Sequence, residues 1–569
     1  MQANSANLIG SFLQNLLWQL YMLFIQICNS TSPAVLTRKM TQGKQKKTTR
    51  LNWSIYLPTT KETRLMNYAY LAEVKGIQAY LTASGKLRDT VAGSQILDQL
   101  LNNPLDAALK AAKSDDHVIT RRAGGALYMS FNSETTRANF AALWRVVVNQ
   151  LLPATELVVA MPEGKPSLRE AIKLGLEQLA SARNQQFISL PCGTPFTQRC
   201  PRTGLPSTKK RQGEWISEPA TVQLMSRTNS GQDSLTQKFS TEPKLKWPSL
   251  LSADNEYQHE SVLPLGASNE LAVVHADGNS LGIILRALAK ATENSDDQSY
   301  QQAYQAFSDG LEHATIKAAQ HATFEVFGEQ LGQEDYIMPM RPIVLGGDDL
   351  TVIIRAEDAF AFAKAFMLSF EQESRGFVSK LKQDCQLNLD LTHLTACAGI
   401  VFIKPNQPFA QALHLAEALC KRAKQAPDAN NKPSALAFAR LNSAGSDSDG
   451  ITGAIDTLKL QSEQLRYPLT GEAGSFEQLA ALAKETTINL MPLREIATLM
   501  GSQNQTAKIH YERWQQHQMQ LHGSSFSAFN ERLQAFINDD QLPIMRKDQL
   551  ASTPLIDLLV LRKYCVKEA

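Results

Sequence analysis

Two short apolar runs, 343–345 and 350–354, flank the string Gly-Gly-Asp-Asp at residues 346–349. Runs of this length rich in Val, Ile and Leu predict β-strands, and the two glycines between them predict a tight hairpin turn. Such a turn holds two carboxylates at the tip of a buried hairpin. Gly and Asp are also ordinary turn residues, so the neighbouring sequence has to distinguish a functional site from an exposed turn.

A third apolar run, 271–276, lies upstream and is followed by Asp277. The turn that follows contains Gly278, and the pattern predicts a helix from about Leu281. If this strand lies beside the hairpin, Asp277 faces the hairpin tip. Three carboxylates would then offer the hard oxygen ligands that Mg²⁺ or Mn²⁺ prefers, and the turn amides with the helix N-terminus would favour a bound phosphate.

The downstream residues continue this arrangement. The apolar run 394–402 predicts another strand, and a helix over 410–424 follows it. The order strand, helix, hairpin, helix, strand, helix predicts an α+β fold of the ferredoxin-like, or palm, type. Of the cations at the end of the last helix, we expect Lys424 to reach a triphosphate. Lys421 and Arg422 are expected to be solvated cations at a helix C-terminus.

On these residues the chain resembles the catalytic palm of the large subunit of type III CRISPR effector complexes, a family related to GGDEF-type nucleotide cyclases. The resemblance rests on Asp277, the 346–349 hairpin, 398–400 (Ala-Gly-Ile) and the pair 423–424 (Ala-Lys). It implies metal-dependent condensation of ATP into cyclic oligoadenylates in antiviral defence. It also implies partner effector subunits and guide or target RNA. Relatives often carry a second acid where this chain has Asn279, which puts metal affinity in question.

The candidate site follows from the motif and the resemblance together. We expect Asp277, Asp348 and Asp349 to be the catalytic and metal-binding residues, and the nucleotide-binding residues to be Gly278, Asn279, Ser280, Gly346, Gly347 and Lys424.

An earlier part of the chain is a loose internal repeat of this pattern and resembles the non-catalytic palm of the same family. Glu73 takes the place of Asp277 at a strand end. The runs 117–120 and 127–131 flank Ala-Gly-Gly-Ala at residues 123–126, which keeps both glycines and lacks the acids. We therefore expect two palms packed face to face. The first is expected to be structural, or a platform for adenine and phosphate.

The amino-acid composition bears on three questions, namely a nucleic-acid partner, the redox compartment and a zinc site. The chain has 569 residues, of which 43% are hydrophobic and 20% charged, and its net charge of +2 neither requires nor excludes nucleic acid. Its seven cysteines form no C-x-x-C motif, so no strong zinc ribbon or redox motif is present. Their odd number and scattered positions fit a reducing cytoplasm. Cys192 and Cys200 lie where relatives often carry a zinc-binding insertion. Two thiols do not complete a tetrahedral site, so zinc is not expected. Cys397 and Cys420 are expected in the core.

The first 65 residues contain an apolar run, Ile9 to Cys28, interrupted by amide side chains and followed by lysines and arginines. One interpretation is a membrane anchor with a cationic flank. The other, which we favour, is a disordered or mis-started extension with the true start at Met66. A cytoplasmic protein without membrane association is expected.

The expected domains are an extension at 1–65, a degenerate palm at 66–190, a zinc-like remnant and linker at 191–265, the catalytic palm at 266–440 and a helical bundle at 456–569. Within these, 207–260 is expected to be a linker or a long surface loop that joins the palms, and 441–455 is expected to be a second linker. No HD nuclease pattern precedes the first palm, so DNase activity is not expected. Two alternatives to catalysis of this type stay open. One is a silent scaffold that binds guide RNA and protein partners, and the other is a stand-alone nucleotide cyclase.

Overall fold

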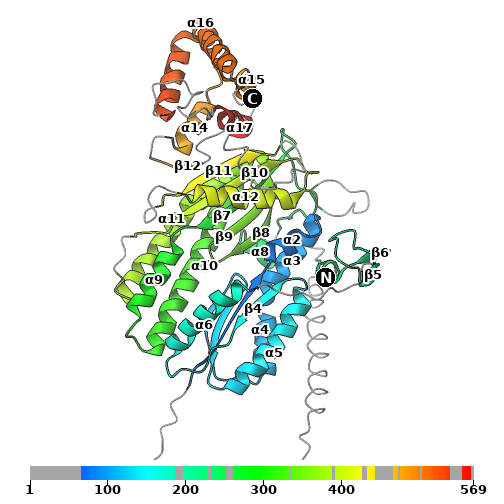
Figure 1. The fold of residues 1–569 in the computed structure, drawn as a ribbon. Helices are drawn as coiled ribbons and strands as arrows, with labels where there is room; N and C mark the ends of the chain where they lie inside the picture. The colour runs from blue at the N-terminus through cyan, green and yellow to red at the C-terminus, as the bar shows by residue number, and fades with distance from the viewer. Residues whose placement is uncertain are drawn as a thin grey trace, which may run out of the picture.

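The computed structural model places two α+β domains in contact, with a group of helices at the C-terminal end (Figure 1). The described residues are 66–185, 194, 196–227, 233–251, 261–387, 391–425, 432–441, 466–499, 503–537 and 554–565, except 212, 243, 334, 472 and 473. The expectations for Ile9 to Cys28, for Cys192 and for the linker at 441–455, apart from residue 441, lie outside them.

The first domain has a four-stranded sheet of order β2-β3-β1-β4, in which paired neighbours are antiparallel. Its strands are β1 (Tyr68–Lys75), β2 (His117–Ala123), β3 (Ala126–Phe131) and β4 (Glu156–Ala160). Its helices are α2 (Ile77–Thr82), α3 (Leu87–Leu100), α4 (Asn103–Ala111), α5 (Glu134–Leu151) and α6 (Leu168–Arg183). The chain order β-α-β-β-α-β with this strand order is the ferredoxin-like fold, as predicted.

The second domain repeats this topology in a six-stranded sheet of order β12-β11-β10-β7-β9-β8. Its strands are β7 (Leu271–Gly278), β8 (Met340–Gly346), β9 (Asp349–Arg355), β10 (Ala396–Ile403), β11 (Ala435–Arg440) and β12 (Tyr467–Pro468). Its helices are α9 (Leu281–Ala291), α10 (Asp297–Phe327), α11 (Ala359–Asp384) and α12 (Phe409–Ala423). The four strands β10, β7, β9 and β8 correspond to β4, β1, β3 and β2, which confirms two ferredoxin-like palms.

Both faces of the second sheet are covered, and every residue of β10 is buried. Helix α11 packs on one face and α12 on the other. A Cβ at Gly399 in β10 would overlap the carbonyl oxygen of Ala416 in α12. This glycine therefore allows α12 to lie directly on the strand, which fixes the position of the helix C-terminus near the end of β7.

The two palms are in direct contact along β8. Helix α3 of the first palm packs on this strand, and Val344 joins the hydrophobic core of the first palm. The Ser94 hydroxyl donates a hydrogen bond to the carbonyl of Ile343. Helix α10 also reaches the first palm, where the Asp297 carboxylate accepts a hydrogen bond of 2.9 Å from the backbone of Leu168. The hairpin that carries the two acids is thus supported by both domains.

The prediction of a linker over 207–260 is wrong for the described part of that stretch. It contains β5 (Lys209–Arg211), β6 (Glu214–Ile216), α7 (Glu218–Met225) and α8 (Ser234–Gln237). Buried residues from this stretch pack against the second palm, among them Leu235, Phe239, Leu245 and Trp247. The elements are too short to produce a hydrophobic period, so the composition resembled that of a linker.

The described C-terminal helices pack against one another and against the second palm, which confirms the predicted bundle. They are α14 (Phe476–Ala483), α15 (Leu493–Leu499), α16 (Asn504–Ile537) and α17 (Leu555–Cys565). The ring of Tyr564 in α17 stacks on Phe402 of β10 at 4.0 Å. Within the described residues, no helix combines the length and hydropathy needed to cross a bilayer.

Candidate metal and nucleotide site

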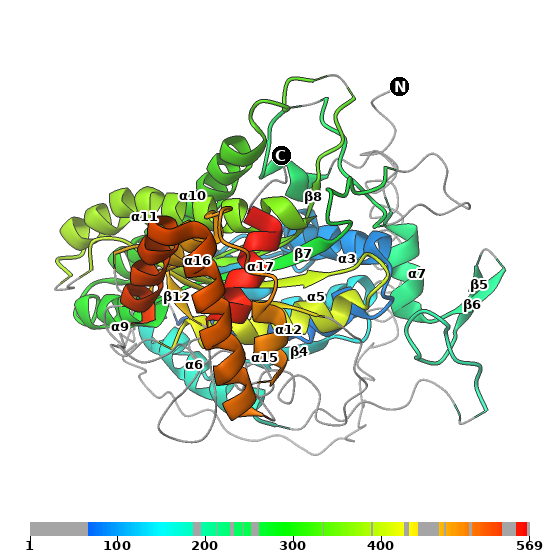
Figure 2. The same ribbon diagram turned by 90° about the horizontal axis from the view of Figure 1, so that it is seen from above.

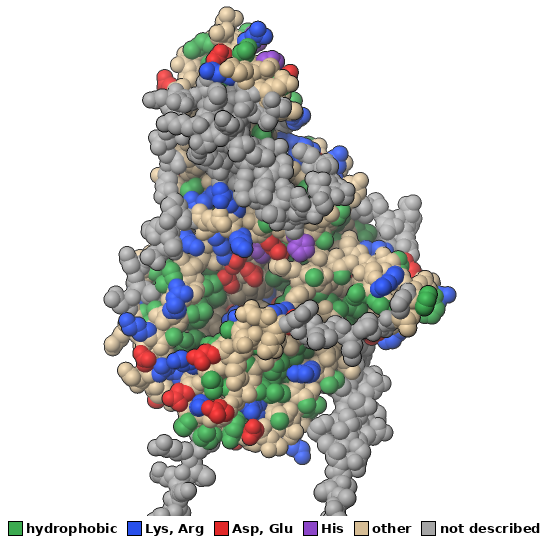
Figure 3. All heavy atoms as spheres, viewed as in Figure 1, with side chains coloured by type: hydrophobic (Ala, Val, Ile, Leu, Met, Phe, Trp, Pro, Cys, Tyr) green, Lys and Arg blue, Asp and Glu red, His purple; other side chains and the backbone are tan. Residues whose placement is uncertain are grey.

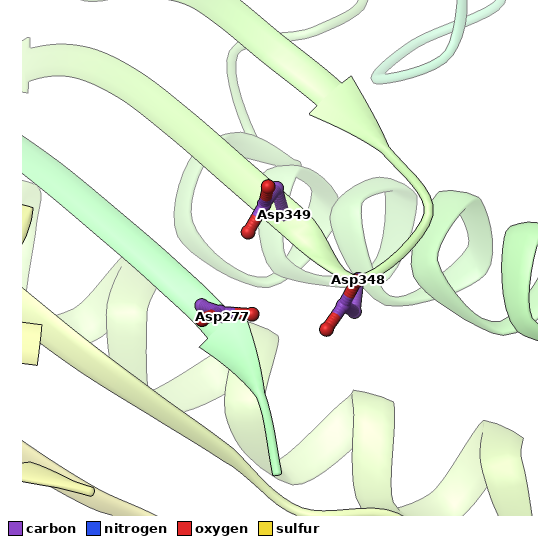
Figure 4. A group of neighbouring side chains, drawn as sticks. All are labelled: Asp277, Asp348 and Asp349. Carbon is purple, nitrogen blue, oxygen red and sulfur yellow. The ribbon is translucent and has the colours of Figure 1, made fainter. Parts of the chain in front are cut away.

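Three carboxylates converge where β7 ends and the β8–β9 hairpin turns (Figure 4). Pairing of Ala276 with Leu350 places Asp277 next to Asp349, and Asp348 precedes it in the turn. One oxygen from each of the three side chains lies within 4.8 Å of the other two. Gly347 turns the hairpin with a φ of 63°, a conformation that suits glycine. Within the described residues, this is the sole group of three or more His, Cys, Asp or Glu side chains that is able to hold a metal ion.

The charges of these acids are poorly compensated. Burial, followed by the charge of Asp277, raises the pKa of Asp348 to about 7 and that of Asp349 to about 8. Burial also acts to raise the pKa of Asp277, but the ammonium of Lys424 outweighs it and the pKa is lowered. Like charges held this close together favour protons on the acids or a cation between them. Carboxylate oxygens crowded in this way suit a hard divalent cation such as Mg²⁺ or Mn²⁺.

Lys424 lies at this cluster, whereas its two neighbouring cations do not contact it. Its Nζ forms an ion pair with Asp277 and donates a hydrogen bond of 2.8 Å to the carbonyl of Gly278. Lys421 is exposed, and Arg422 donates to Gln425 at 2.6 Å.

The turn after Asp277 brings the backbone close to the acids. A Cβ at Gly278 would lie 2.8 Å from the Cβ of Asp348, so glycine permits this approach. Ser280 has a φ of 66° and precedes α9 without a side-chain cap. Asn279 is 2% exposed, and its Nδ2 donates to Thr395 Oγ1 at 3.0 Å and to Cys397 Sγ at 3.3 Å. Its side chain is therefore directed into the domain and not to the carboxylates.

A cavity of about 580 Å³ lies between the two palms. Both glycine pairs line it, Gly124 and Gly125 from the first palm and Gly346 and Gly347 from the second, together with Asp349. Figure 3 shows acidic, basic and histidine side chains gathered near the middle of one face of the molecule. The carboxylates thus stand at the edge of a space large enough for part of a nucleotide.

Sequence reasoning missed two residues of this cavity, His414 and Glu417 of α12, which lie 3.8 Å apart. Burial raises the pKa of Glu417 to about 7, and its Oε1 has no hydrogen-bond partner in the described part of the chain. A sequence pattern could have identified them. Polar residues recur at helical spacing along one side of this otherwise apolar helix, at positions 414, 417, 421 and 424.

His275 belongs to the lining of the same cavity. It is buried, its Nδ1 lies 3.0 Å from the hydroxyl of Thr351, and burial lowers its pKa to about 4. Cys397 and Cys420 are fully buried core residues, as predicted.

The first palm has no matching group of acids. Glu73 pairs with Ala126, the position equivalent to Asp349. Its carboxylate accepts a hydrogen bond of 2.7 Å from Nε of Arg183 and another from Tyr128. Burial acts to raise the pKa of Glu73, but the hydrogen bonds from Arg183 and Tyr128 lower it. Glu73 is thus held by internal partners.

Cys200, one of the two cysteines of the zinc-like segment, is 2% exposed and surrounded by hydroxyl groups. Burial opposes ionisation of its thiol, but hydrogen bonds from Thr203 and Ser217 outweigh this and lower its pKa to about 7. The hydroxyls of Thr203 and Ser217 lie 2.8 Å apart.

The second palm is similar to a domain of known proteins. Residues 270–432 match the family model of the Cas10/Cmr2 second palm domain. The crystal structure of a Csm1–Csm4 cassette in complex with AMPPNP is 12% identical, with 89% of this chain and 70% of that chain covered and a TM-score of 0.46. The corresponding apo cassette is 13% identical, with coverages of 90% and 72% and a TM-score of 0.43.

The Csm1–Csm4 subcomplex of the type III-A CRISPR-Csm interference complex is 12% identical, with coverages of 89% and 71% and a TM-score of 0.42. No curated protein matches the chain. The family model spans Asp277, the acidic hairpin and Lys424 in one continuous match. Residues 270–432 are therefore similar to the second palm domain of the Cas10/Cmr2 family.

Proposed function

We propose that this chain condenses ATP into cyclic oligoadenylates, which serve as signals in antiviral defence, at the carboxylate cluster of the second palm. The observation that carries the proposal is the convergence of Asp277, Asp348 and Asp349, with one oxygen of each within 4.8 Å of the others, at the edge of the inter-palm cavity. The family match to the second palm supports it.

Asp277, Asp348 and Asp349 would hold Mg²⁺ or Mn²⁺. The raised pKa values of Asp348 and Asp349 support this assignment, because a cation would offset both the burial and the repulsion from Asp277 that raise them. When bound, divalent ions neutralise the triphosphate and activate the attacking hydroxyl for in-line displacement of pyrophosphate.

The remaining site residues position the phosphates. Gly346, Gly347 and Gly278 present backbone without side chains, so a triphosphate can approach the hairpin closely. Ser280 leaves the first amides of α9 without a side-chain cap, and such amides favour an anion. Lys424 is already paired with Asp277 and would supply a positive charge next to the triphosphate.

The cavity would hold the base and ribose of one nucleotide. Ile77, Leu97 and Leu101 of the first palm give it an apolar wall. Glu417 has an unpartnered carboxylate oxygen in the same lining, suited to accept a hydrogen bond from the exocyclic amine of adenine. In this proposal the first palm is the nucleotide platform, and Gly124 and Gly125 allow close contact.

The family match to the second palm also supports a proposal about partners. We propose that the chain works with a second effector subunit and with guide and target RNA. The names of the Csm1–Csm4 structures describe complexes of those proteins with AMPPNP, cA3 and cA4.

The alternative is a silent scaffold, and Asn279 in place of a second acid favours it. Purified protein is incubated with labelled ATP and Mn²⁺, with and without target RNA, and the products are resolved by chromatography. Cyclic oligoadenylates support the proposal. A stable protein that binds RNA and leaves ATP unchanged supports the scaffold, and a different cyclic nucleotide supports a stand-alone cyclase.

A further inference from the structure

The C-terminal end of α12 carries Lys424 and is held by an arginine from a later part of the chain. Arg466 immediately precedes β12, and its Nε donates a hydrogen bond of 3.0 Å to the carbonyl of Ala423, the last residue of α12. The next residue is Lys424, which forms the ion pair with Asp277. Because the last carbonyls of a helix have no partner within it, a cationic donor from outside stabilises this turn.

The backbone that carries Arg466 is itself fixed. Tyr467 follows it in the sequence and pairs with Leu436 of β11. The Tyr467 side chain is fully buried, its hydroxyl donates to Asp557 of α17, and its ring lies 6.3 Å from that of Phe536 of α16. Figure 1 shows the C-terminal helices above the β12 edge of the sheet, and Figure 2 shows α16 lying over β12. Arg466 is therefore anchored between the sheet of the second palm and the C-terminal bundle.

The contacts of the two cations are of different kinds. In the part of the chain that the structure describes, Nη2 of Arg466 has no hydrogen-bond partner, so the bond to Ala423 is the polar contact that a substitution removes. Lys424 contacts the site itself, through its ion pair with Asp277 and a hydrogen bond of 2.8 Å to the carbonyl of Gly278. Both contacts depend on where the last turn of α12 ends, because this turn sets the position of the Lys424 backbone.

We propose that Arg466 is a positioning residue, which holds the end of α12 so that Lys424 stays against Asp277. For its effect on turnover the inference rests on the proposed function, in which Lys424 supplies a charge beside the triphosphate. Arg466 bonds to the backbone of α12, so its effect on turnover passes through Lys424. Displacing an aligned group by on the order of 1 Å is sufficient to lower a rate strongly.

A double-mutant cycle measures whether the effect of Arg466 passes through Lys424. Arg466→Gln is expected to lower kcat about tenfold and to change KM for ATP less than about threefold, because Lys424 acts on charge that develops during the reaction. Arg466→Lys keeps a cationic donor and is expected to lower kcat by about threefold or less. In a Lys424→Met background, Arg466→Gln should change kcat less than about twofold, since the positioned group is already absent. An equal loss of kcat in both backgrounds would overturn the proposal.

The reactivity of the Lys424 amine provides a second measurement, without ATP or metal. The full chain is treated with N-hydroxysuccinimide acetate, and acetylation of each lysine is followed by mass spectrometry. Arg466→Gln is expected to raise the acetylation rate of Lys424 several-fold, because the amine leaves its pair with Asp277, and to leave the rate at Lys421 unchanged. An unchanged rate at Lys424 in a folded Arg466→Gln variant would overturn the proposal.

A matched control separates this contact from general effects. Arg532 of α16 also donates its Nε to a backbone carbonyl, that of Ala528 at 3.2 Å, within the bundle. Arg532→Gln should change neither kcat nor the acetylation rate of Lys424. Thermal melting verifies folding, and if Arg466→Gln does not fold, Arg466→Lys replaces it, with smaller shifts expected in the same direction. If the unaltered protein leaves ATP unchanged, the proposed function fails and the acetylation rate alone decides this inference.

Discussion

Lys424 at the C-terminal end of α12 forms an ion pair with Asp277 at the end of β7. The two residues are far apart in the sequence, and close packing of α12 on Gly399 brings them together. Lys424 also lowers the pKa of Asp277 below its usual value, although burial acts in the opposite direction. One acid of the cluster is thereby kept ionised while its two neighbours have raised pKa values.

Replacing this ammonium should impair the site without unfolding the palm. Lys424→Met is expected to reduce ATP turnover roughly a hundredfold, because it removes a preorganised charge beside the triphosphate. Lys421→Met on the same helix is the matched control, since Lys421 is exposed and lies one turn away. Steady-state kinetics of the two variants provide the measurement. Equal activity of both would mean that Lys424 only pairs with Asp277.

Metal binding should depend on pH in a defined direction. Asp348 and Asp349 have pKa values raised to about 7 and about 8, so protons compete with a cation below these values. In metal-free protein the free energy of unfolding falls as the pH rises from the usual Asp value of 3.8 to about 8, because ionisation of these acids is penalised in the folded state. Mn²⁺ should therefore raise the melting temperature more at pH 8 than at pH 6. A shift that is larger at pH 6 would contradict the assignment.

The two palms should respond unequally to loss of their equivalent acids. Glu73→Ala breaks a half-exposed contact with Arg183 and is expected to cost about 1 kcal/mol or less while turnover changes little. Asp277→Ala is expected to abolish turnover. Kinetics at saturating Mn²⁺ compare the two variants, with melting curves to verify folding. A folded Glu73→Ala variant as inactive as Asp277→Ala would make the first palm catalytic.

A separate carboxylate should control docking of the last helix. Glu270 accepts hydrogen bonds from Arg440 of β11 and from Lys563 and Tyr564 of α17. Burial opposes its ionisation, but these partners lower its pKa to about 2. Its contribution to stability is thus present above the unfolded value near 4.5 and is lost as the pH falls toward 2.

Glu270→Gln is expected to cost about 3 kcal/mol at neutral pH, because a buried charged network is broken. Melting curves recorded between pH 7 and about pH 2 should show that the gap between variant and unaltered protein narrows as the pH decreases. A gap independent of pH would assign the loss to packing alone.

Local pattern was sufficient for the parts of the site that are close in sequence. The hairpin at 346–349 was predicted because apolar runs flank the glycines, and the strand ending at Asp277 was predicted for the same reason. The β-α-β-β-α-β order then predicted both palms. The element boundaries of α12 differ from the expectation by one residue at each end.

Long-range packing decided what the pattern could not. The stretch 207–260 contains few apolar residues in short elements, and its buried ion pair between Asp233 and Arg341 of β8 becomes visible only in three dimensions. Asn279 was expected to bind nucleotide, but its side chain turns toward Thr395 and Cys397. Glu417 was missed because its environment includes the first palm, far away in sequence.

The most direct test of the proposed activity compares the unaltered protein with Asp348→Ala plus Asp349→Ala, using labelled ATP, Mn²⁺ and target RNA. We expect cyclic oligoadenylates from the first protein and none from the second. The variant should melt at the same temperature or higher, because carboxylates that repel one another are removed. Undiminished turnover by a folded double variant would contradict the account.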